Sequence, residues 1–445
     1  MPKADRCIGI GVIGLGTVGG GVVKLINSHR ESYVSGYGIH LEVVRGCALV
    51  PEAADACGLP RERFTDNWRE LISDQAVDIV VELIGGEHPA LEIHEAAIAA
   101  GKHIVTANKA LLGVHVEHLG TLAAKAGVQI KCEAAAAGGI PVVNALEHAL
   151  VANRILTIAG ILNGTTNYIL SRMEREGADY ADVLADAQRL GFAEADPTAD
   201  VGGFDAASKT AILASIGFHT RVTAADVFVE GIERISAEDI AVASELGYAI
   251  KLLGIARASE HGVEARVHPA MIPADHQLAA VSGPMNAVYI VGDAVGETMF
   301  YGAGAGSFPT ASAVVGDILA LAEPMSRGEE PLAEIEPYDR VLPILSMHEL
   351  TNRFYLRLLV EDRAGALAAT SEVLARRAIS ISSIRQLDGD GTGGACTVVL
   401  LTHEAREADV AAALDELAQL SCVREVANVI RIEDVDAWTQ GTDLA

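Results

Sequence analysis

Continuous apolar runs alternate with amphipathic stretches over the first 135 residues. The runs lie at 7–13, 41–50, 77–85, 103–108 and 128–134. Runs of this length without polar alternation are typical of strands buried on both faces, and the stretches between them have helical spacing. The pattern therefore predicts a doubly wound α/β domain over residues 1–135, with a helix directly after its first strand.

The pattern changes in the next 170 residues. Helices are expected near 167–176 and 205–216, and they mix with strand-like runs such as 287–293. Helices and strands that do not alternate regularly indicate an α+β unit. We expect a second domain over residues 136–305.

The remainder of the chain predicts a returning helix, a linker and a small third domain. Residues 306–323 have helical spacing and are expected to pack back on the first domain, and 324–350 are rich in Pro and Glu. Residues 351–434 follow the order β-α-β-β-α-β, which is ferredoxin-like. Residues 435–445 are expected to form a tail.

Composition restricts the class of partner. The formal net charge is −27 at pH 7 and half of the residues are hydrophobic. Nucleic acids and anionic membranes require clustered Lys and Arg, so we expect neither as a partner and favour a small molecule. The six cysteines have neither metal-ligand nor disulfide-framework spacing, and no signal peptide or long apolar span is present. These features favour a cytoplasmic protein with reduced thiols.

A glycine loop follows the first predicted strand and opens the first predicted helix. It consists of Gly14, Gly16, Thr17, Val18 and Gly19 in a GxGxxG pattern. In this context the first glycine makes a tight turn and the second lets the backbone approach a pyrophosphate. The third permits close packing of helix on strand. The loop predicts a Rossmann-type dinucleotide site.

The choice between NADP and NAD stays open at this point. An acidic residue after the second strand would hold a ribose hydroxyl, and a nearby Arg would hold a 2′-phosphate. The chain has Leu49, Val50, Pro51 and Glu52 there, so neither signal stands where it is expected.

Asp205 and Lys209 are candidate catalytic residues. They lie four residues apart on a predicted helix and so share one face. A surface ion pair would explain the spacing equally well, but this helix continues as the apolar TAILASIGF. Charges on a largely buried helix are more often functional.

Five motifs in order resemble homoserine dehydrogenases. They are VTANKALL (105–112), EAAAAGGIPVV (133–143), GILNGTTNYIL (160–170), GFAEADPTADVGGFDAASKTAILA (191–214) and YGAGAGSFPTASAVVGDI (301–318). The resemblance implies reversible, NAD(P)H-dependent reduction of aspartate-4-semialdehyde to homoserine. It also implies that the second domain is the catalytic and dimerisation domain.

The resemblance assigns a role to each of five residues. Lys209 would transfer the proton to or from the substrate oxygen, and Lys109 would polarise the reacting centre beside the cofactor. Glu194 and Asp205 would hold the substrate, and Gly191 would contact both substrate and cofactor. Independently of the family, a developing oxyanion calls for a cationic group and an amino-acid substrate calls for a carboxylate.

Two further sites follow from the resemblance alone. Backbone carbonyls of Glu133, Ala136, Gly138 and Ile140 would bind a monovalent cation, and the resemblance implies that this ion is sodium. Gly304, in a glycine-rich stretch before the returning helix, would place backbone amides on the cofactor.

The third domain resembles an ACT domain, a small module that senses amino acids. Its strand-to-helix turn would lie at 360–367, and the implied effector is threonine. A purely structural dimerisation module remains the alternative. A homodimer or homotetramer is expected.

Two other functions stay open on the sequence. One is a related amino-acid or semialdehyde dehydrogenase that forms an acyl intermediate on Cys132. The other is a non-catalytic amino-acid sensor built on a dehydrogenase scaffold. A fused aspartate kinase is not expected, because the first predicted strand begins at residue 7.

Overall fold

The N-terminal unit is a parallel sheet with helices on both faces. The computed structural model describes residues 6–329, 331, 341–387 and 394–440. Its first sheet has the order β3-β2-β1-β4-β5-β6, with every adjacent pair parallel. This is the Rossmann order, in which the strand order reverses between β1 and β4. The predicted doubly wound fold is confirmed.

The strands and helices of this unit keep close to the predicted runs. The strands are β1 (Cys7–Ile13), β2 (His40–Cys47), β3 (Phe64–Thr65), β4 (Ile79–Glu82), β5 (His103–Thr106) and β6 (Ile130–Lys131). The helices are α1 (Thr17–Tyr37), α2 (Glu52–Cys57), α3 (Trp68–Ser73), α4 (Ala90–Ala99) and α5 (Lys109–Ala126).

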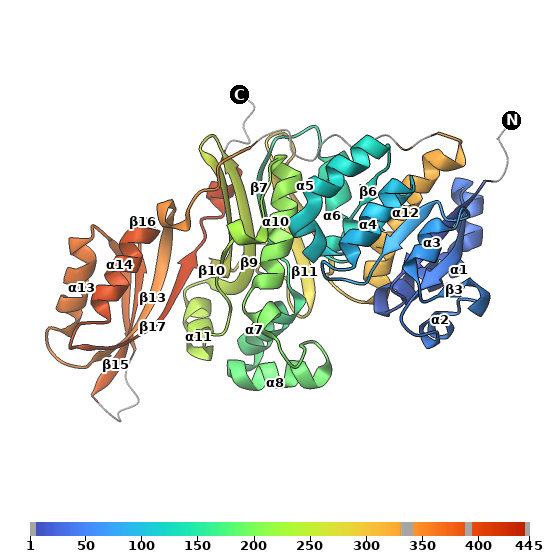
Figure 1. The fold of residues 1–445 in the computed structure, drawn as a ribbon. Helices are drawn as coiled ribbons and strands as arrows, with labels where there is room; N and C mark the ends of the chain where they lie inside the picture. The colour runs from blue at the N-terminus through green and yellow to red at the C-terminus, as the bar shows by residue number, and fades with distance from the viewer. Residues whose placement is uncertain (1–5, 330, 332–340, 388–393, 441–445) are drawn as a thin grey trace.

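The helix α12 (Ser307–Ser326) packs back on this unit, at the opposite end of the molecule from the C-terminal strands (Figure 1). A side chain at Gly21 of α1 would lie 2.8 Å from Ser307 Oγ and 3.1 Å from Ala311 Cβ. The Ser307 hydroxyl donates to the Thr17 carbonyl at 2.6 Å. The chain therefore leaves the nucleotide unit and returns to cover its first helix.

The central unit contributes mostly antiparallel strands to a second sheet. Its strands are β7 (Ile155–Ile161), β8 (Phe228–Val229), β9 (Tyr248–Ser259), β10 (Gly262–Pro273), β11 (Met285–Gly292) and β12 (Gly296–Ala303). Its helices are α6 (Val142–Asn144), α7 (Gly164–Glu176), α8 (Tyr180–Leu190), α9 (Thr198–Val201), α10 (Phe204–Phe218) and α11 (Ala237–Glu245). Helix α10 lies between this sheet and α5, and it contacts both of them.

The C-terminal unit has the predicted ferredoxin-like order. It comprises β13 (Thr351–Glu361), α13 (Ala366–Arg376), β14 (Ile381–Leu387), β15 (Ala395–Thr402), β16 (Ala405–Arg406), α14 (Glu407–Leu417) and β17 (Val423–Ile432). Its last strand pairs with β10 through Ala270 with Arg431 and Met271 with Ile432. The two units consequently share one 11-stranded sheet.

A buried carboxylate joins the central and C-terminal units. Asp239 of α11 accepts hydrogen bonds from Arg357 Nε at 2.6 Å, Asn428 Nδ2 at 2.8 Å and the Tyr355 hydroxyl at 3.1 Å. Burial raises the pKa of Asp239, but the hydrogen bonds from Arg357 and Asn428 outweigh it and the pKa is lowered. The contact is therefore an ionised pair removed from water.

Asp239→Ala should lower the free energy of unfolding by about 3–5 kcal/mol, because it leaves the half-buried Arg357 without its main partner. Urea unfolding at neutral pH measures this loss. The control is Glu238→Ala, since Glu238 contacts the same Arg357 at 2.9 Å but is 42% exposed and should cost less than about 1 kcal/mol. The folded-state pKa of Asp239 is depressed, so its stabilisation should disappear as pH falls through that pKa. Equal losses for the two variants would contradict this account.

Three predicted segments differ from the structure. Helix α1 continues ten residues past Asn27 to Tyr37, because Tyr33 is buried and anchors the polar last turns. Helix α12 extends to Ser326, into the expected linker, with Met325 buried on its inner face. The expected tail begins with a 3-10 helix at Asp436–Thr439, and Trp438 is 1% exposed in the central core.

The expected linker is also partly built into the central unit. The Val263 amide donates to the Pro343 carbonyl at 2.9 Å, and the Leu345 amide donates to the Val263 carbonyl at 2.8 Å. These two bonds place residue Ile344 beside Val263 of β10 as an isolated parallel bridge. Residues 330 and 332–340 of that segment lie outside the described part of the chain.

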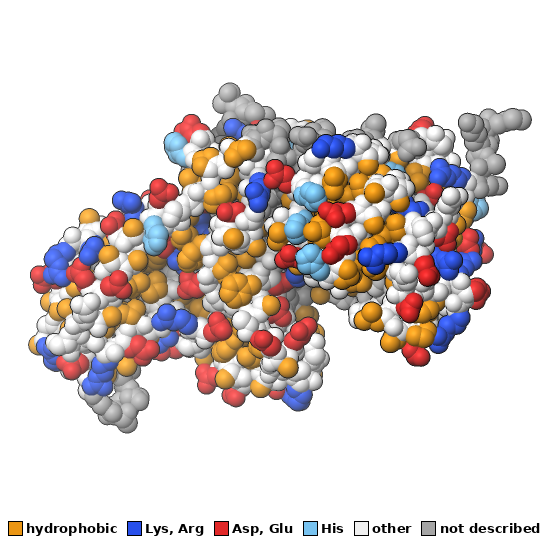
Figure 2. All heavy atoms as spheres, viewed as in Figure 1, with side chains coloured by type: hydrophobic (Ala, Val, Ile, Leu, Met, Phe, Trp, Pro, Cys, Tyr) orange, Lys and Arg blue, Asp and Glu red, His pale blue; other side chains and the backbone are white. Residues whose placement is uncertain are grey.

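Acidic and basic side chains are interspersed on the face shown in Figure 2. An anionic ligand approaching this face must be held by local groups such as helix N-termini and single lysines. Among the described residues, no helix is both long and apolar enough to cross a membrane.

Candidate active site

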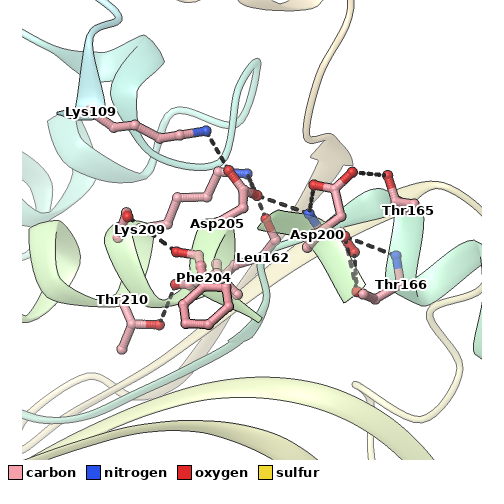
Figure 3. A network of polar contacts seen from close by, with 12 residues as sticks. Lys109, Leu162, Thr165, Thr166, Asp200, Phe204, Asp205, Lys209 and Thr210 are labelled. Atoms are coloured by element: carbon pink, nitrogen blue, oxygen red, sulfur yellow. Dashed lines mark hydrogen bonds and ion pairs between the residues drawn. The ribbon is translucent and has the colours of Figure 1, made fainter. Parts of the chain in front are cut away.

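Two lysines meet one aspartate where the nucleotide and central units touch (Figure 3). Lys109 is the first residue of α5, and Asp205 and Lys209 lie one turn apart on α10. Asn108 caps α5 by accepting the Leu111 amide at 3.1 Å, which places Lys109 at the end of β5. The predicted Asp205 and Lys209 face is thus directed at the nucleotide unit.

The aspartate uses both oxygens in this cluster. Lys209 Nζ donates to Asp205 Oδ2 at 2.7 Å and to the Leu162 carbonyl at 2.8 Å. Lys109 Nζ donates to Asp205 Oδ1. Lys209 is 9% exposed, whereas 41% of the Lys109 side chain remains exposed. Lys209 is therefore enclosed by protein atoms, whereas the Lys109 side chain is partly exposed.

The ionisation of Asp205 follows from these contacts. Burial raises the pKa of the Asp205 carboxyl, but the charges of Lys209 and Lys109 outweigh burial and hold it well below its ordinary value. Asp205 stays ionised through the neutral range. It can hold a protonated lysine in place while itself taking no part in proton transfer.

A second aspartate, which no pattern in the sequence singles out, completes the cluster. Asp200 of α9 accepts from Asn163 Nδ2 at 2.7 Å and from the Thr165 hydroxyl at 3.0 Å. The same Asn163 nitrogen donates to Asp205 Oδ2 at 2.9 Å. Both aspartates lie in one quoted motif, but sequence spacing alone gives no reason to pair Asp200 with a residue 37 positions earlier.

Glu194 and Gly191 lie apart from these contacts. Glu194 is exposed, and within the described chain its carboxylate makes neither a hydrogen bond nor an ion pair. Its carbonyl accepts from Gln188 Nε2 at 3.1 Å. Gly191 ends α8 with a φ of 79°, a value that favours glycine on backbone grounds alone. The structure therefore does not bring either residue into the lysine cluster.

The glycine loop has the shape that the motif requires. Gly14 has a φ of 97°, and a methyl group at Gly19 would lie 1.8 Å from the Gly14 carbonyl oxygen. At Gly16 a methyl group would meet no protein atom within 4 Å. Protein packing explains Gly14 and Gly19, whereas the space beside Gly16 is open at the N-terminus of α1. Thr17 and the half-buried Val18 form the first turn there.

A fully buried carboxylate orders the neighbouring strand ends. Glu82, at the end of β4, accepts from the Thr106 hydroxyl at 2.9 Å, from Asn108 Nδ2 at 3.3 Å and from the Ile84 amide at 2.8 Å. His94 Nε2 lies 3.2 Å from the same carboxylate. The network fixes the cap of α5 and hence the start of the helix that carries Lys109. No motif in the sequence indicated it.

Known proteins are similar to nearly the whole of this chain. The model described as the NAD-binding domain of homoserine dehydrogenase matches residues 14–133, and the homoserine dehydrogenase model matches 141–319. The ACT domain model matches 354–419. The homoserine dehydrogenase of Mycobacterium tuberculosis is 44% identical, with 97% of this chain and 99% of that protein covered. The chain belongs to the homoserine dehydrogenase family.

Two other homoserine dehydrogenases are similar to this chain over nearly its full length. The homoserine dehydrogenase of Bacillus subtilis is 41% identical, with 98% of this chain and 100% of that protein covered. The crystal structure of a homoserine dehydrogenase from Thiobacillus denitrificans has a TM-score of 0.90 at 44% identity, covering 97% of this chain and 99% of the other. These matches identify an NAD(P)-dependent oxidoreductase with an ACT domain, as the sequence predicts.

The turn for which the resemblance implies a bound cation is buried. Ala136 is fully buried, Ile140 is 1% exposed, and Gly138 has a φ of 60°. The Glu133 carboxylate accepts the Val143 and Asn144 amides at 2.9 and 2.7 Å. No group of three or more His, Cys, Asp or Glu side chains suited to a metal occurs in the described residues. A cation here would depend mainly on backbone oxygens.

Gly304 packs against this turn. A side chain at Gly138 would lie 2.1 Å from the Gly304 carbonyl oxygen, and one at Gly304 would lie 2.0 Å from Asn286 Nδ2. Internal packing therefore already explains glycine at position 304.

Cys132, the nucleophile of the alternative dehydrogenase, lines an apolar cavity of about 110 Å³ between α5 and α10. Leu112, Val116, Ile212 and Ile216 surround the same cavity. Apolar surroundings raise the cost of forming a thiolate, and Lys109, Asp205 and Lys209 do not line this cavity.

Proposed function

We propose that this chain reduces aspartate-4-semialdehyde to homoserine, reversibly, at the cluster of Lys109, Asp205 and Lys209. The observation that carries the proposal is the buried ammonium of Lys209, which is held by Asp205 and the Leu162 carbonyl. It lies where the nucleotide unit meets the central unit. A cation there can stabilise a carbonyl oxygen that gains negative charge.

We propose the following roles for the chain in the reaction. The nicotinamide, when bound, supplies or accepts the hydride. Lys209 gives a proton to the aldehyde oxygen in reduction and takes one from the homoserine hydroxyl in reverse. Asp205 keeps Lys209 oriented, and Lys109 adds positive charge from the nucleotide side. The added hydride and proton balance the conversion of aldehyde to alcohol.

We propose that the substrate ammonium binds the carboxylates of Asp200 and Glu194. Asp200 is half-buried and accepts from neutral donors, the Asn163 amide and the Thr165 hydroxyl. It has lone pairs left for an ammonium group. Glu194 is exposed on the segment before α9 and would reach the substrate from that side. Gly191 would allow close approach of ligand to backbone.

We propose that the cofactor binds along the glycine loop, with its pyrophosphate in the open space beside Gly16. Leu49, after β2, is 94% exposed and apolar, which favours neither a ribose hydroxyl nor a 2′-phosphate. We therefore propose that NADP and NAD are both accepted. An archaeal homoserine dehydrogenase of the same fold was solved in complex with NADPH, at 24% identity and a TM-score of 0.60.

The substrate assignment is tested by initial rates of nicotinamide reduction with homoserine and with 4-hydroxybutyrate, which lacks the amino group. Loss of one charge-assisted contact costs about 1.5–3 kcal/mol, so kcat/KM should fall by roughly 10- to 150-fold. Equal rates would exclude the proposed ammonium site. The same assay with NADP and NAD measures cofactor choice.

We propose that the carbonyls of Glu133, Ala136, Gly138 and Ile140 bind a monovalent cation, sodium. The buried carboxylates of Glu133 and Asp317 lie beside this turn, and the Glu133 amide donates to Asp317 at 2.9 Å. Burial raises the pKa of both groups. A bound cation would offset their desolvation.

Exchanging sodium for choline at constant ionic strength should therefore lower the thermal midpoint of the enzyme. Mass action with a site that binds only the folded chain predicts this shift. A midpoint that is equal in the two salts would contradict the site.

We propose the functional division into a nucleotide domain (1–135), a catalytic and dimerisation domain (136–305) and an ACT domain (351–434). We further propose that threonine binds the ACT domain and inhibits, and that the enzyme is a homodimer or homotetramer. The pairing of β10 with β17 supports coupling of effector and active site, because it joins the central and C-terminal units in one sheet. Activity against threonine concentration tests inhibition.

A further inference from the structure

The Asn163 amide stands between the two aspartates of the site. Asn163 is 4% exposed and precedes α7. Its Nδ2 donates to Asp200 Oδ1 at 2.7 Å and to Asp205 Oδ2 at 2.9 Å. Its Oδ1 accepts the Thr166 amide at 2.8 Å, which caps α7. Every polar group of the side chain is therefore used, and each amide hydrogen serves a different carboxylate.

This arrangement separates two functions of one side chain. The cap needs only an oxygen acceptor, which Ser or Asp provides as well as Asn. The second function is the bridge, by which we mean the two hydrogen bonds from Asn163 Nδ2 to Asp200 and Asp205. The bridge needs an NH₂ group with two donors, which neither Ser nor ionised Asp provides. Substitutions at position 163 can therefore remove the bridge while leaving the cap in place.

The bridge acts between like charges. Asp205 is compensated by Lys209 and Lys109, whereas Asp200 on α9 has only neutral donors among the described contacts. Without the amide hydrogens, the two carboxylates would face each other and one would favour its protonated form. The pair of carboxylates would then present less negative charge to an ammonium ligand.

We propose that Asn163 is a positioning residue that holds Asp200 and Asp205 at a fixed separation, so that one binds the amino group of the substrate while the other orients Lys209. The proposal rests on the proposed function. It assigns to the motif GILNGTTNYIL a role that is distinct from helix formation.

Asn163→Ser and Asn163→Asp test the proposal by pH profiles of kcat/KM for homoserine. We expect roughly 10- to 100-fold losses at neutral pH, because a hydrogen bond to a charged group is worth about 1.5–3 kcal/mol. The acidic limb of the Asn163→Ser profile should move to higher pH. The matched control is Asn67, an exposed N-cap that accepts the Arg69 amide at 3.1 Å, where the same two changes should alter neither rate nor profile. Wild-type rates and an unchanged limb in both Asn163 variants would overturn the proposal.

A second readout does not depend on turnover. The thermal midpoint of Asn163→Asp should fall relative to that of Asn163→Ser as pH rises from about 5 to about 8, because a third carboxylate ionises beside Asp200 and Asp205. Equal pH responses would show that position 163 is only a cap and would overturn the bridge. An inactive wild-type enzyme with the expected midpoints would instead disprove the homoserine reaction and leave the bridge standing.

Discussion

Lys209→Met should lower kcat by roughly 10³-fold, the usual magnitude for removal of a general acid or base. Methionine keeps an unbranched buried side chain of similar length, so α10 should remain packed. The variant removes the ammonium that Asp205 and the Leu162 carbonyl hold. Asp205 also loses one of the two charges that depress its pKa, so its pKa should rise. Steady-state rates with homoserine and cofactor measure the loss.

The control for this prediction is Lys125→Met. Lys125 lies on the exposed last turn of α5, and a surface change of this kind should leave the rate within about twofold. The thermal midpoints of both variants show whether they are folded. A folded Lys209→Met enzyme with kcat within a few fold of wild type would remove Lys209 from the reaction.

Gly16→Ala should weaken cofactor binding by roughly 10- to 100-fold, since forcing a methyl group into an occupied space costs about 1–3 kcal/mol. The φ of Gly16 is −75°, which alanine adopts without strain. No protein atom lies within 4 Å of the added carbon. The stability of the folded protein should therefore be unchanged, whereas the added methyl group should clash with a bound dinucleotide.

Gly36→Ala provides the matched control on the same helix. Its added carbon also meets nothing within 4 Å, but it lies near the far end of α1. Alanine inside a helix should stabilise the chain by about 0.5–1 kcal/mol without changing cofactor affinity. Titration of NADPH fluorescence compares the two variants. Unchanged affinity in Gly16→Ala would place the pyrophosphate elsewhere.

The sequence predicts much of the fold because its strongest signals are local. Each of the five apolar runs of the first domain overlaps one of its strands, whereas the two-residue β3 lies outside them, and the glycine loop lies between β1 and α1. The ferredoxin-like order of the third domain is also confirmed. These features depend on the period of apolar residues and on turn chemistry, which neighbouring residues determine.

The active site is only partly predictable, because some of its contacts join residues that are far apart in the sequence. Asp205 and Lys209 pair within one helix turn, so spacing reveals them. Lys109 meets Asp205 across 96 residues, and the family resemblance, not the spacing, brought it into the prediction. The resemblance also indicates Glu194, yet this residue lies exposed and outside the contacts of the cluster.

The contacts between units do not correspond to any periodic pattern in the sequence. Trp438 is buried in a segment expected to be a tail, because it packs against Tyr289 and His276 of the central core. Asp239 is an ordinary capping-box acid in the sequence, and only the fold brings Arg357 to it. Tertiary packing determines both, so a single sequence does not predict them.

The most direct test of the Lys109, Asp205 and Lys209 site is the isotopic composition of its product. Purified enzyme is given aspartate-4-semialdehyde and NADPH that carries deuterium at the transferable position, and the homoserine formed is examined by mass spectrometry. We expect one deuterium on the carbon that bears the hydroxyl group, formed in step with cofactor oxidation, and loss of that product in Lys209→Met. Cofactor oxidation without deuterated homoserine, or equal labelling by the variant, would contradict the assignment.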